Sequence, residues 1–172
     1  MMTRLLHLIL NRVMERVVKF RGKRVSNGEW LYGDLMHDNT GGCYIYPLEC
    51  DNLYKENAVL PESVGQFTGL HDYKGREIYE GDVLFVREWE NLAMRVFDHE
   101  EREQFSLEEC KGSILHESQR VVCFEEGSMC AGDYYISTLW DKQDKQHQYP
   151  IFEVEIIGNI HDNPNLSTDG ND

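Results

Sequence analysis

The chain has 172 residues, a length that fits one compact domain able to bury roughly two thirds of its unfolded surface. Hydrophobic residues make up 41% and aromatic residues 11% of the sequence, which excludes a disordered composition. The 31 acidic and 17 basic residues give a net charge of -14, which opposes binding to nucleic-acid phosphates and to anionic membranes. We therefore expect no direct nucleic-acid binding and no membrane partner.

The cysteine and histidine spacing gives no metal-site pattern. The sequence has no C-x-x-C, and none of its seven histidines lies three or four residues from another. An odd number of cysteines without such motifs is typical of reduced thiols in a cytoplasmic protein. We expect no metal and no cofactor, and we expect the protein in the cytoplasm. The cysteines are Cys43, Cys50, Cys110, Cys123 and Cys130.

Residues 1–13 are interpreted as an N-terminal extension. Their apolar run is short, is interrupted by His7 and lacks a small-residue cleavage site, so it does not match a signal peptide. A short amphipathic helix is one reading, and a misassigned start, with translation beginning at Met14, is another. We expect residues 14–166 to fold without this extension.

The first predicted β segment is a hairpin. Asn27-Gly28 is a two-residue turn signal between arms of alternating polarity. In the second arm, Trp30 and Tyr32 lie on one face and Leu31 on the other. Glycines at 41–42 mark the next turn, before a strand with the sequence CYIYPL.

The central segment contains two tight turns. The stretch PESVGQFTGL predicts a short strand, and Asp72 followed by Gly75 has the residue order of a hairpin turn. The strand GREIY then bends at Glu80-Gly81-Asp82 and continues as the buried strand VLFV. Acids at such bends are usually solvated turn formers, so we interpret Glu80 and Asp82 as structural residues in contact with water.

Residues 87–119 have a different pattern. Trp89, Leu92, Val96 and Phe97 recur at helical spacing, which predicts an amphipathic helix, and a capping-box pattern at 106–109 predicts a second helical turn. The apolar stripe packs on the β core in the default interpretation. A partner-binding surface is an alternative, and contact with a second copy of the chain, which would make a homo-oligomer, is another.

The remainder of the chain returns to β structure. The sequence RVVCFEEGSMCAG predicts a hairpin with its turn at Glu-Gly-Ser, and DYYISTLW predicts a further strand. After a polar loop, IFEVEIIGNI alternates as a half-buried strand does. Residues 167–172 form a polar tail that we expect to fray.

Three segments of this pattern resemble one family, the YopX-like proteins of phages and prophages. They are KFRGK with the following GEWLYGDL, then PESVGQFTGLHDYKGREIYEGDVL, and IIGNIHDNPNL near the end. The resemblance rests on the order and spacing of Trp30, Gly33, Gly65, Gln66, Thr68, Gly69, Asp72, Gly75, Glu80, Gly81, Asp82, Gly158 and Asn159.

The resemblance implies an α+β fold, mainly antiparallel β, with an SH3-like barrel component. Together with the predicted elements this gives a single domain over residues 14–166 with short helices. The stretch at about 87–119 is longer than the connection usual in the family, so we interpret it as a helical insertion that carries the amphipathic helix and about which the resemblance says nothing. The role of the family is not established, so the resemblance supplies no catalytic, cofactor or metal residue. The matched positions are interpreted as structural: glycines at turns and close approaches, and turn-forming acids.

Three functions compete on the sequence alone. The first is a phage accessory protein that is not an enzyme and binds another macromolecule, a protein, in the host cytoplasm. The second is an acidic decoy that imitates DNA and occupies a host protein's DNA-binding groove, because clustered carboxylates can imitate phosphates. The third is a metal-dependent hydrolase built on Asp72, Glu80, Asp82 and Asp162.

Overall fold

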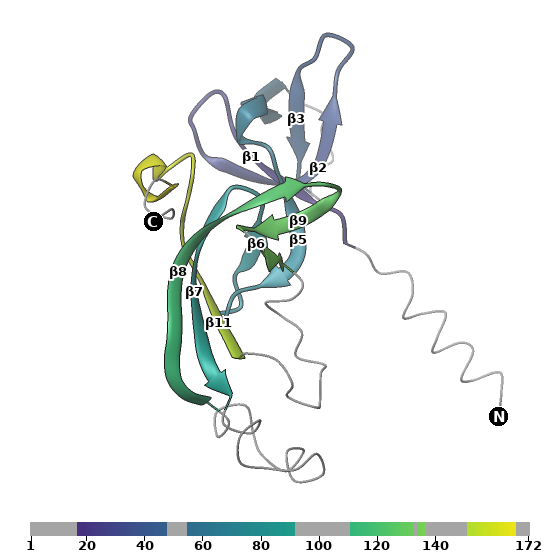
Figure 1. The fold of residues 1–172 in the computed structure, drawn as a ribbon. Coiled ribbons are helices and arrows are strands. Elements are labelled where there is room, and N and C mark those ends of the chain that lie inside the picture. The colour runs from purple at the N-terminus through teal and green to yellow at the C-terminus, as the bar shows by residue number, and fades with distance from the viewer. Residues whose placement is uncertain (1–16, 48–54, 92–110, 133, 137–150, 168–172) are drawn as a thin grey trace, which may run out of the picture.

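The structure is a computed structural model that describes residues 17–47, 55–91, 111–132, 134–136 and 151–167. Within these ranges the chain forms eleven β-strands and three short 3-10 turns, and no α-helix. The strands belong to two antiparallel sheets, one built from the first half of the chain and one mainly from the second half (Figure 1). The 3-10 turns are η1 (Lys55–Asn57), η2 (Pro61–Ser63) and η5 (Pro164–Ser167).

The first sheet has six strands in the order β4-β3-β2-β1-β5-β6. Strands that follow each other along the chain pair with each other, except β4 and β5. Strand β5 pairs instead with β1, which therefore lies between β2 and β5. The bounds are β1 (Phe20–Lys23), β2 (Trp30–His37), β3 (Cys43–Tyr46), β4 (Ala58–Val59), β5 (Gly65–His71) and β6 (Glu77–Tyr79).

The second sheet has five strands in the order β10-β9-β8-β7-β11. Its long strands β7, β8 and β11 run side by side in the lower half of Figure 1. The bounds are β7 (Asp82–Asn91), β8 (Lys111–Glu125), β9 (Ser128–Ala131), β10 (Tyr134–Tyr135) and β11 (Ile151–Asn159).

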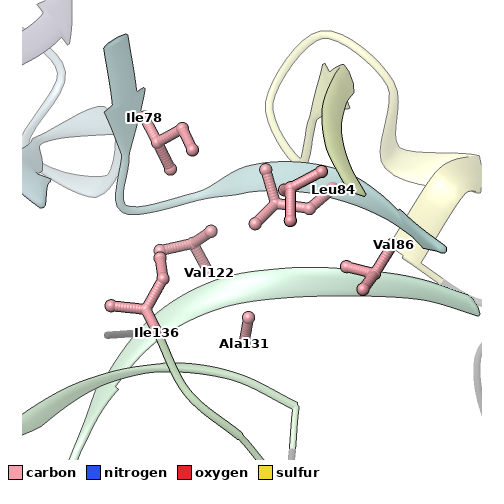
Figure 2. Packing of buried hydrophobic residues seen from close by; sticks show 7 residues of the cluster. Ile78, Leu84, Val86, Val122, Ala131 and Ile136 are labelled. Atoms are coloured by element: carbon pink, nitrogen blue, oxygen red, sulfur yellow. The ribbon is translucent and has the colours of Figure 1, made fainter. Parts of the chain in front are cut away.

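Each sheet has its own hydrophobic core. Leu31, Ile45 and Val59 pack with Cys43 in the first sheet. In the second sheet the apolar side chains of β7, β8, β9 and β11 pack together, and Figure 2 shows how Ile78 joins them from β6. Because Ile78 belongs to the first sheet but packs in the core of the second, the β6–β7 corner links the two sheets. The cluster consists of Ile78, Leu84, Val86, Val122, Ala131, Ile136 and Val154.

The expected barrel is not present among the described residues, which form two open sheets. The prediction of antiparallel β structure is confirmed. The expectation of a barrel component came from the family resemblance. The first sheet does not close into a barrel, because its last strand, β6, leads directly into β7 of a separate sheet.

The predicted helix is wrong at its start, where residues 87–91 continue strand β7. The far end of the predicted insertion, residues 111–119, belongs to strand β8. The physical reason is that β7 is paired on both sides, with β8 and with β11, so its backbone groups are satisfied by neighbouring strands. Leu92, Val96, Phe97 and the capping-box pattern lie outside the described residues.

The first hairpin has a longer loop than the Asn27-Gly28 pattern predicts. The backbone N–H of Arg24 donates to the Glu29 carbonyl at 2.8 Å, so the loop spans 25–28. Arg24 also forms a bridge to Val59 of β4, which keeps this part of the chain extended and moves the reversal further along. The pattern located the turn but not its length.

Most other local predictions are confirmed. The turn before β3, the Asp72–Gly75 turn and the turn between β8 and β9 lie where the sequence predicts them. The strand predicted at the end of the chain is β11. The strand predicted at 133–140 is described only as the short β10, and its remainder lies outside the described residues.

Candidate functional site

Strand β1 presents three cations on one face. Lys19, the residue before β1, and Arg21 and Lys23 on the strand occupy alternate positions of the chain and therefore point to the same side of the sheet. Each of them reaches a carboxylate supplied by a distant part of the chain. Lys19 pairs with Glu77, Arg21 with Asp82, and Lys23 with Asp162. The face of β1 thus joins the first sheet to the β6–β7 corner and to the turn after β11.

The central pair of this row is buried. The Arg21 Nη1 and Asp82 Oδ1 atoms lie 2.7 Å apart, and their side chains are only 7% and 2% exposed. Arg21 Nη2 also donates to the Glu80 carbonyl at 3.1 Å, and the Tyr79 backbone N–H donates to the second Asp82 oxygen at 2.8 Å. Burial raises the pKa of Asp82 above its ordinary value, and Arg21 and the Tyr79 amide oppose that rise. The expectation that Asp82 is solvated is therefore wrong.

Aromatic rings enclose the Arg21 guanidinium. Its central carbon lies 4.6 Å from the centre of the Trp30 ring and 5.1 Å from that of Tyr79. Tyr32 meets the Tyr79 ring edge-on at 5.5 Å. The Tyr79 hydroxyl donates to Glu77 at 2.7 Å, and burial together with this bond raises the pKa of Tyr79. These rings hold the buried cation in a fixed orientation.

The turn after β11 closes one end of this arrangement. The Asn159 side-chain oxygen accepts the backbone N–H groups of His161 and Asp162, both at 2.9 Å, which fixes the turn. Asp162 in turn accepts the Trp30 indole N–H at 2.9 Å and the Asn159 amide at 2.7 Å. Hydrogen bonds from Asn159, Lys23 and Trp30 hold the pKa of Asp162 well below its ordinary value.

The Asp72 turn closes the opposite end. One Asp72 oxygen accepts the backbone N–H groups of Lys74 and Arg76, and the other accepts Arg76 Nε at 2.8 Å and the Ile156 N–H at 3.2 Å. Burial alone would raise the pKa of Asp72, but the hydrogen bonds from Arg76 and Ile156 hold it below its ordinary value. Arg76 Nη2 also donates to the Ile156 carbonyl at 2.6 Å. The turn therefore fastens the β5–β6 hairpin to β11.

Between these two ends lies a hollow of about 550 Å³. It opens between the first sheet, the β6–β7 corner and the end of β11, so residues from both halves of the chain form its walls. Tyr32 and Arg76 are its most exposed large side chains, at 48% and 46%. We refer to it below as the inter-sheet hollow. Its lining consists of Arg21, Trp30, Tyr32, Arg76, Glu77, Tyr79, Asp82, Ile156, Ile157, Gly158, Asn159 and Asp162.

The residues that carry the family resemblance gather at this hollow. Trp30, Asp82, Gly158 and Asn159 line it directly. The others hold the strands behind it. In the β5–β6 hairpin, Asp72 and Gly75 form the turn fastened to β11, Thr68 donates to the Ile78 carbonyl, and Gly69 lies where the register of β5 and β6 shifts. At the β6–β7 corner, Gly65 and Gln66 contact the backbone of Glu80, and Gly81 donates its N–H to the Val122 carbonyl of β8. Gly33 packs against the backbone of Tyr46.

Close packing explains the glycine at position 65. A Cβ atom there would collide with the carbonyl oxygen of Glu80, so the corner can approach β5 only across a bare backbone. Gly75 is required for another reason, because its φ of 81° is left-handed. Each of the two positions thus has a backbone reason for glycine, a close approach at Gly65 and a left-handed φ at Gly75.

The predicted partner surface does not form a helical stripe where it can be described. Trp89 lies on β7, opposite Ile114 of β8 and Ile151 of β11, and Lys111 lies 5.3 Å above its ring. The other three residues, Leu92, Val96 and Phe97, lie outside the described ranges.

The four carboxylates of the hydrolase hypothesis do not form a shared site. Asp72 is paired with Arg76, Asp82 with Arg21 and Asp162 with Lys23. Across the described ranges, no group of three or more His, Cys, Asp or Glu side chains is placed to hold a metal ion. In the same ranges the chain has no helix long and apolar enough to cross a membrane.

Sequence reasoning missed the basic face of β1. Lys19, Arg21, Lys23, Tyr79 and Arg76 were not singled out as site residues, although three cations at alternate positions of a predicted strand were visible in KFRGK. In a chain with a net charge of -14, three cations on one strand face indicate that acids from elsewhere must meet them.

Comparison with known proteins gives the family. The YopX protein family matches residues 19–167, a range that contains every residue of the inter-sheet hollow. The chain belongs to the YopX family. The resemblance drawn from the sequence is thereby confirmed.

Two further comparisons add little to the family assignment. A solved structure titled as protein EF1440 from Enterococcus faecalis is similar to this chain at 18% sequence identity, covering 87% of this chain and 97% of its own, with a TM-score of 0.46. A similarity at this level carries no functional argument. No curated protein matches the chain.

Proposed function

We propose that this YopX family protein is a phage or prophage accessory protein that is not an enzyme and that binds a partner protein in the host cytoplasm. The observation that carries the proposal is the inter-sheet hollow, walled by Trp30, Tyr32 and two arginines. Tryptophan, tyrosine and arginine are the residues that most often dominate the energy of protein interfaces. We assign the hollow as the place where a segment of the partner binds.

The walls of the hollow are held in place before any partner arrives. Trp30 is fixed by its bond to Asp162 and by the stacked Arg21, and Arg76 is fixed by Asp72 and the Ile156 carbonyl. Side chains that are already ordered lose less conformational entropy on binding. This rigidity supports specific binding of one defined segment over non-specific binding of many proteins.

The chemistry of the hollow favours binding over catalysis. Its carboxylates are engaged by cations: Glu77 by Lys19, Asp82 by Arg21 and Asp162 by Lys23. A cation beside a carboxylate stabilises its charged form and so weakens it as a general base. The residues that line the hollow also include no serine, threonine or cysteine that could act as a nucleophile.

The charge of the chain supports a basic partner segment. A net charge of -14 attracts positively charged surfaces and slows the approach of acidic ones. Glu77 and Asp162 are at least one third exposed at the hollow, so a lysine or arginine of the partner can approach them next to the Tyr32 ring.

Site-specific photo-crosslinking tests the proposal. A photoreactive phenylalanine analogue at Tyr32 should give one dominant adduct with a host protein, because this side chain is exposed inside the hollow. The same analogue at Tyr135, which is 57% exposed on β10 outside the hollow, is the matched control. Ile157→Asp alters the wall of the hollow and should reduce the Tyr32 adduct at least tenfold, whereas Phe124→Asp, exposed outside the hollow, should not.

Three results would contradict the proposal. Equal adducts from positions 32 and 135 would show that contact is unspecific. Adducts with the chain itself alone would show self-association. An Ile157→Asp variant that keeps its melting temperature and its adduct would show that the partner binds outside the hollow.

The DNA-mimic function remains the second candidate because of the charge. A decoy would compete with duplex DNA for its host protein, and its adduct should disappear when that DNA is added in excess. A segment bound in the hollow should be displaced by a peptide of the partner and not by DNA.

A further inference from the structure

Two cysteines oppose each other directly in the β8–β9 hairpin. Cys123 of β8 and Cys130 of β9 are register partners, so their side chains lie on the same face of the sheet. The turn between them is a two-residue loop, in which Glu126 and Gly127 have φ values of 49° and 83°. Positive φ at both positions is the conformation that suits the twist of a tight hairpin. The register of the pair is therefore fixed by the turn.

The expected spacing of the pair suits a disulfide. The loop is closed by Glu125 and Ser128, so alternation along the ladder makes Cys123 and Cys130 a hydrogen-bonded pair, with Cα atoms about 5.5 Å apart. A disulfide accepts Cα separations of roughly 4.4–6.8 Å. The Cβ atoms of a hydrogen-bonded pair lie near the upper end of the range of about 4.5–5.5 Å and must approach by roughly 1 Å or more, which stores strain and favours a reducible bond.

The two thiols of the pair differ in exposure and in their surroundings. The Cys130 Sγ donates to the Ser128 carbonyl at 3.7 Å and is buried, whereas Cys123 is partly exposed. Burial raises the pKa of the Cys123 thiol to about 11, and the negative charges of Glu125 and of the neighbouring Cys130 add to the rise. The neighbouring thiol thus contributes to the electrostatics of Cys123.

We propose that Cys123 and Cys130 are a redox modification site, a dithiol that a low-molecular-weight disulfide such as oxidised glutathione converts to an intramolecular disulfide. The partly exposed Cys123 loses its proton and attacks one glutathione sulfur. The disulfide bond of glutathione breaks, one glutathione leaves as a thiolate that takes up a proton, and a mixed disulfide remains on Cys123.

The second step closes the bond. The Cys130 thiolate attacks the Cys123 sulfur and releases the second glutathione, which also takes up a proton. Two protein thiols are oxidised and one glutathione disulfide is reduced to two thiols, so atoms and electrons balance. The new bond lies beside Val122, whose carbonyl accepts the Gly81 N–H at 2.8 Å, and it would fix the strand that holds the β6–β7 corner.

The pH dependence of the rate is part of the inference. Only the thiolate attacks, and the Cys123 thiolate is scarce at neutral pH because of its raised pKa. Oxidation should therefore accelerate about tenfold for each pH unit between about pH 7 and pH 9.

The test uses the full chain, treated with oxidised glutathione and then with an alkylating reagent, followed by digestion and mass spectrometry. We expect a cross-linked peptide pair containing Cys123 and Cys130, two hydrogens lighter than the reduced pair and restored by dithiothreitol. Cys130→Ser should stop at a glutathione adduct on Cys123, because the resolving thiol is missing. Cys43, buried in the other sheet, is the control thiol and should stay alkylatable after unfolding.

Two results would overturn the inference. Separate glutathione adducts on Cys123 and Cys130 of the unsubstituted chain would show that the thiols cannot reach each other. Full alkylation of both cysteines after prolonged treatment at pH 9 would show that the pair is not oxidised. Neither result depends on a partner, so the inference and the proposed function can fail separately.

Discussion

The buried Arg21–Asp82 pair should be the most sensitive polar contact in the described structure. Arg21→Met keeps the apolar stem of the side chain but leaves Asp82 as an unpaired carboxylate that is 2% exposed. Removing one partner of a buried ion pair costs about 3–5 kcal/mol, because the remaining charge stays desolvated. The substitution also deletes the bond to the Glu80 carbonyl. We expect a loss in this range by urea denaturation followed by circular dichroism.

The pH dependence of that loss identifies its cause. The pKa of Asp82 is already raised by burial, and without the arginine it should rise further. An acid with a raised folded-state pKa is less destabilising when it is protonated, so the deficit of Arg21→Met should shrink as the pH is lowered through that pKa. Asp82→Asn removes the charge and can still accept the Tyr79 N–H, so the double variant should be more stable than the sum of the single losses predicts, by at least about 1 kcal/mol.

An exposed ion pair serves as the control. Lys74 pairs with Glu155 and its side chain is 48% exposed, so Lys74→Met should cost no more than about 1 kcal/mol. If Arg21→Met cost as little as the control and showed no pH dependence, the burial of the corner would be refuted. The acids of the Glu80-Gly81-Asp82 bend would then be the solvated residues that the sequence suggested.

The remaining predictions concern the turns and the hollow. Gly75→Val should lower the free energy of unfolding by on the order of 1–3 kcal/mol, because the φ of Gly75 is left-handed. Glu80→Gln should change it by no more than about 0.5 kcal/mol. Chemical denaturation measures both losses, and a larger loss for Glu80→Gln would contradict the structural role of these residues. Trp30→Phe keeps a ring but loses the indole bond to Asp162, so the free energy of unfolding should fall by about 1 kcal/mol. Burial and the nearby Arg21 and Lys23 lower the pKa of His161, so its contribution to stability is complete above the unfolded value of about 6.5 and is lost as the pH falls below it. His161→Asn should therefore flatten the pH dependence of the melting temperature between about pH 7.5 and 5.5, and an unchanged slope would show that His161 is not the titrating group.

The error at residues 87–91 shows where periodicity alone is insufficient. Apolar residues at helical spacing began at Trp89, but that residue lies on a strand with partners on both sides. A strand paired along both edges satisfies its backbone groups whatever its side-chain pattern, so its sequence can imitate one face of a helix. Only the presence of β8 and β11 beside it decides between the two.

The sequence by itself determined the local features of this protein: the turns at Asp72–Gly75 and Glu126–Gly127, the antiparallel strands and the family. The turns depend on residues within a few positions of each other, where backbone preferences and side-chain-to-backbone hydrogen bonds act, and the family follows from the order of several such segments along the chain. The tertiary structure decided which charges meet, because Lys19, Arg21 and Lys23 pair with acids 58 or more residues away, and it buried the Arg21–Asp82 pair among them. No local pattern carries the free energy of such contacts, which arises when the two sheets exclude water from the face of β1. The inter-sheet hollow follows from that same arrangement and could be seen only in the folded chain.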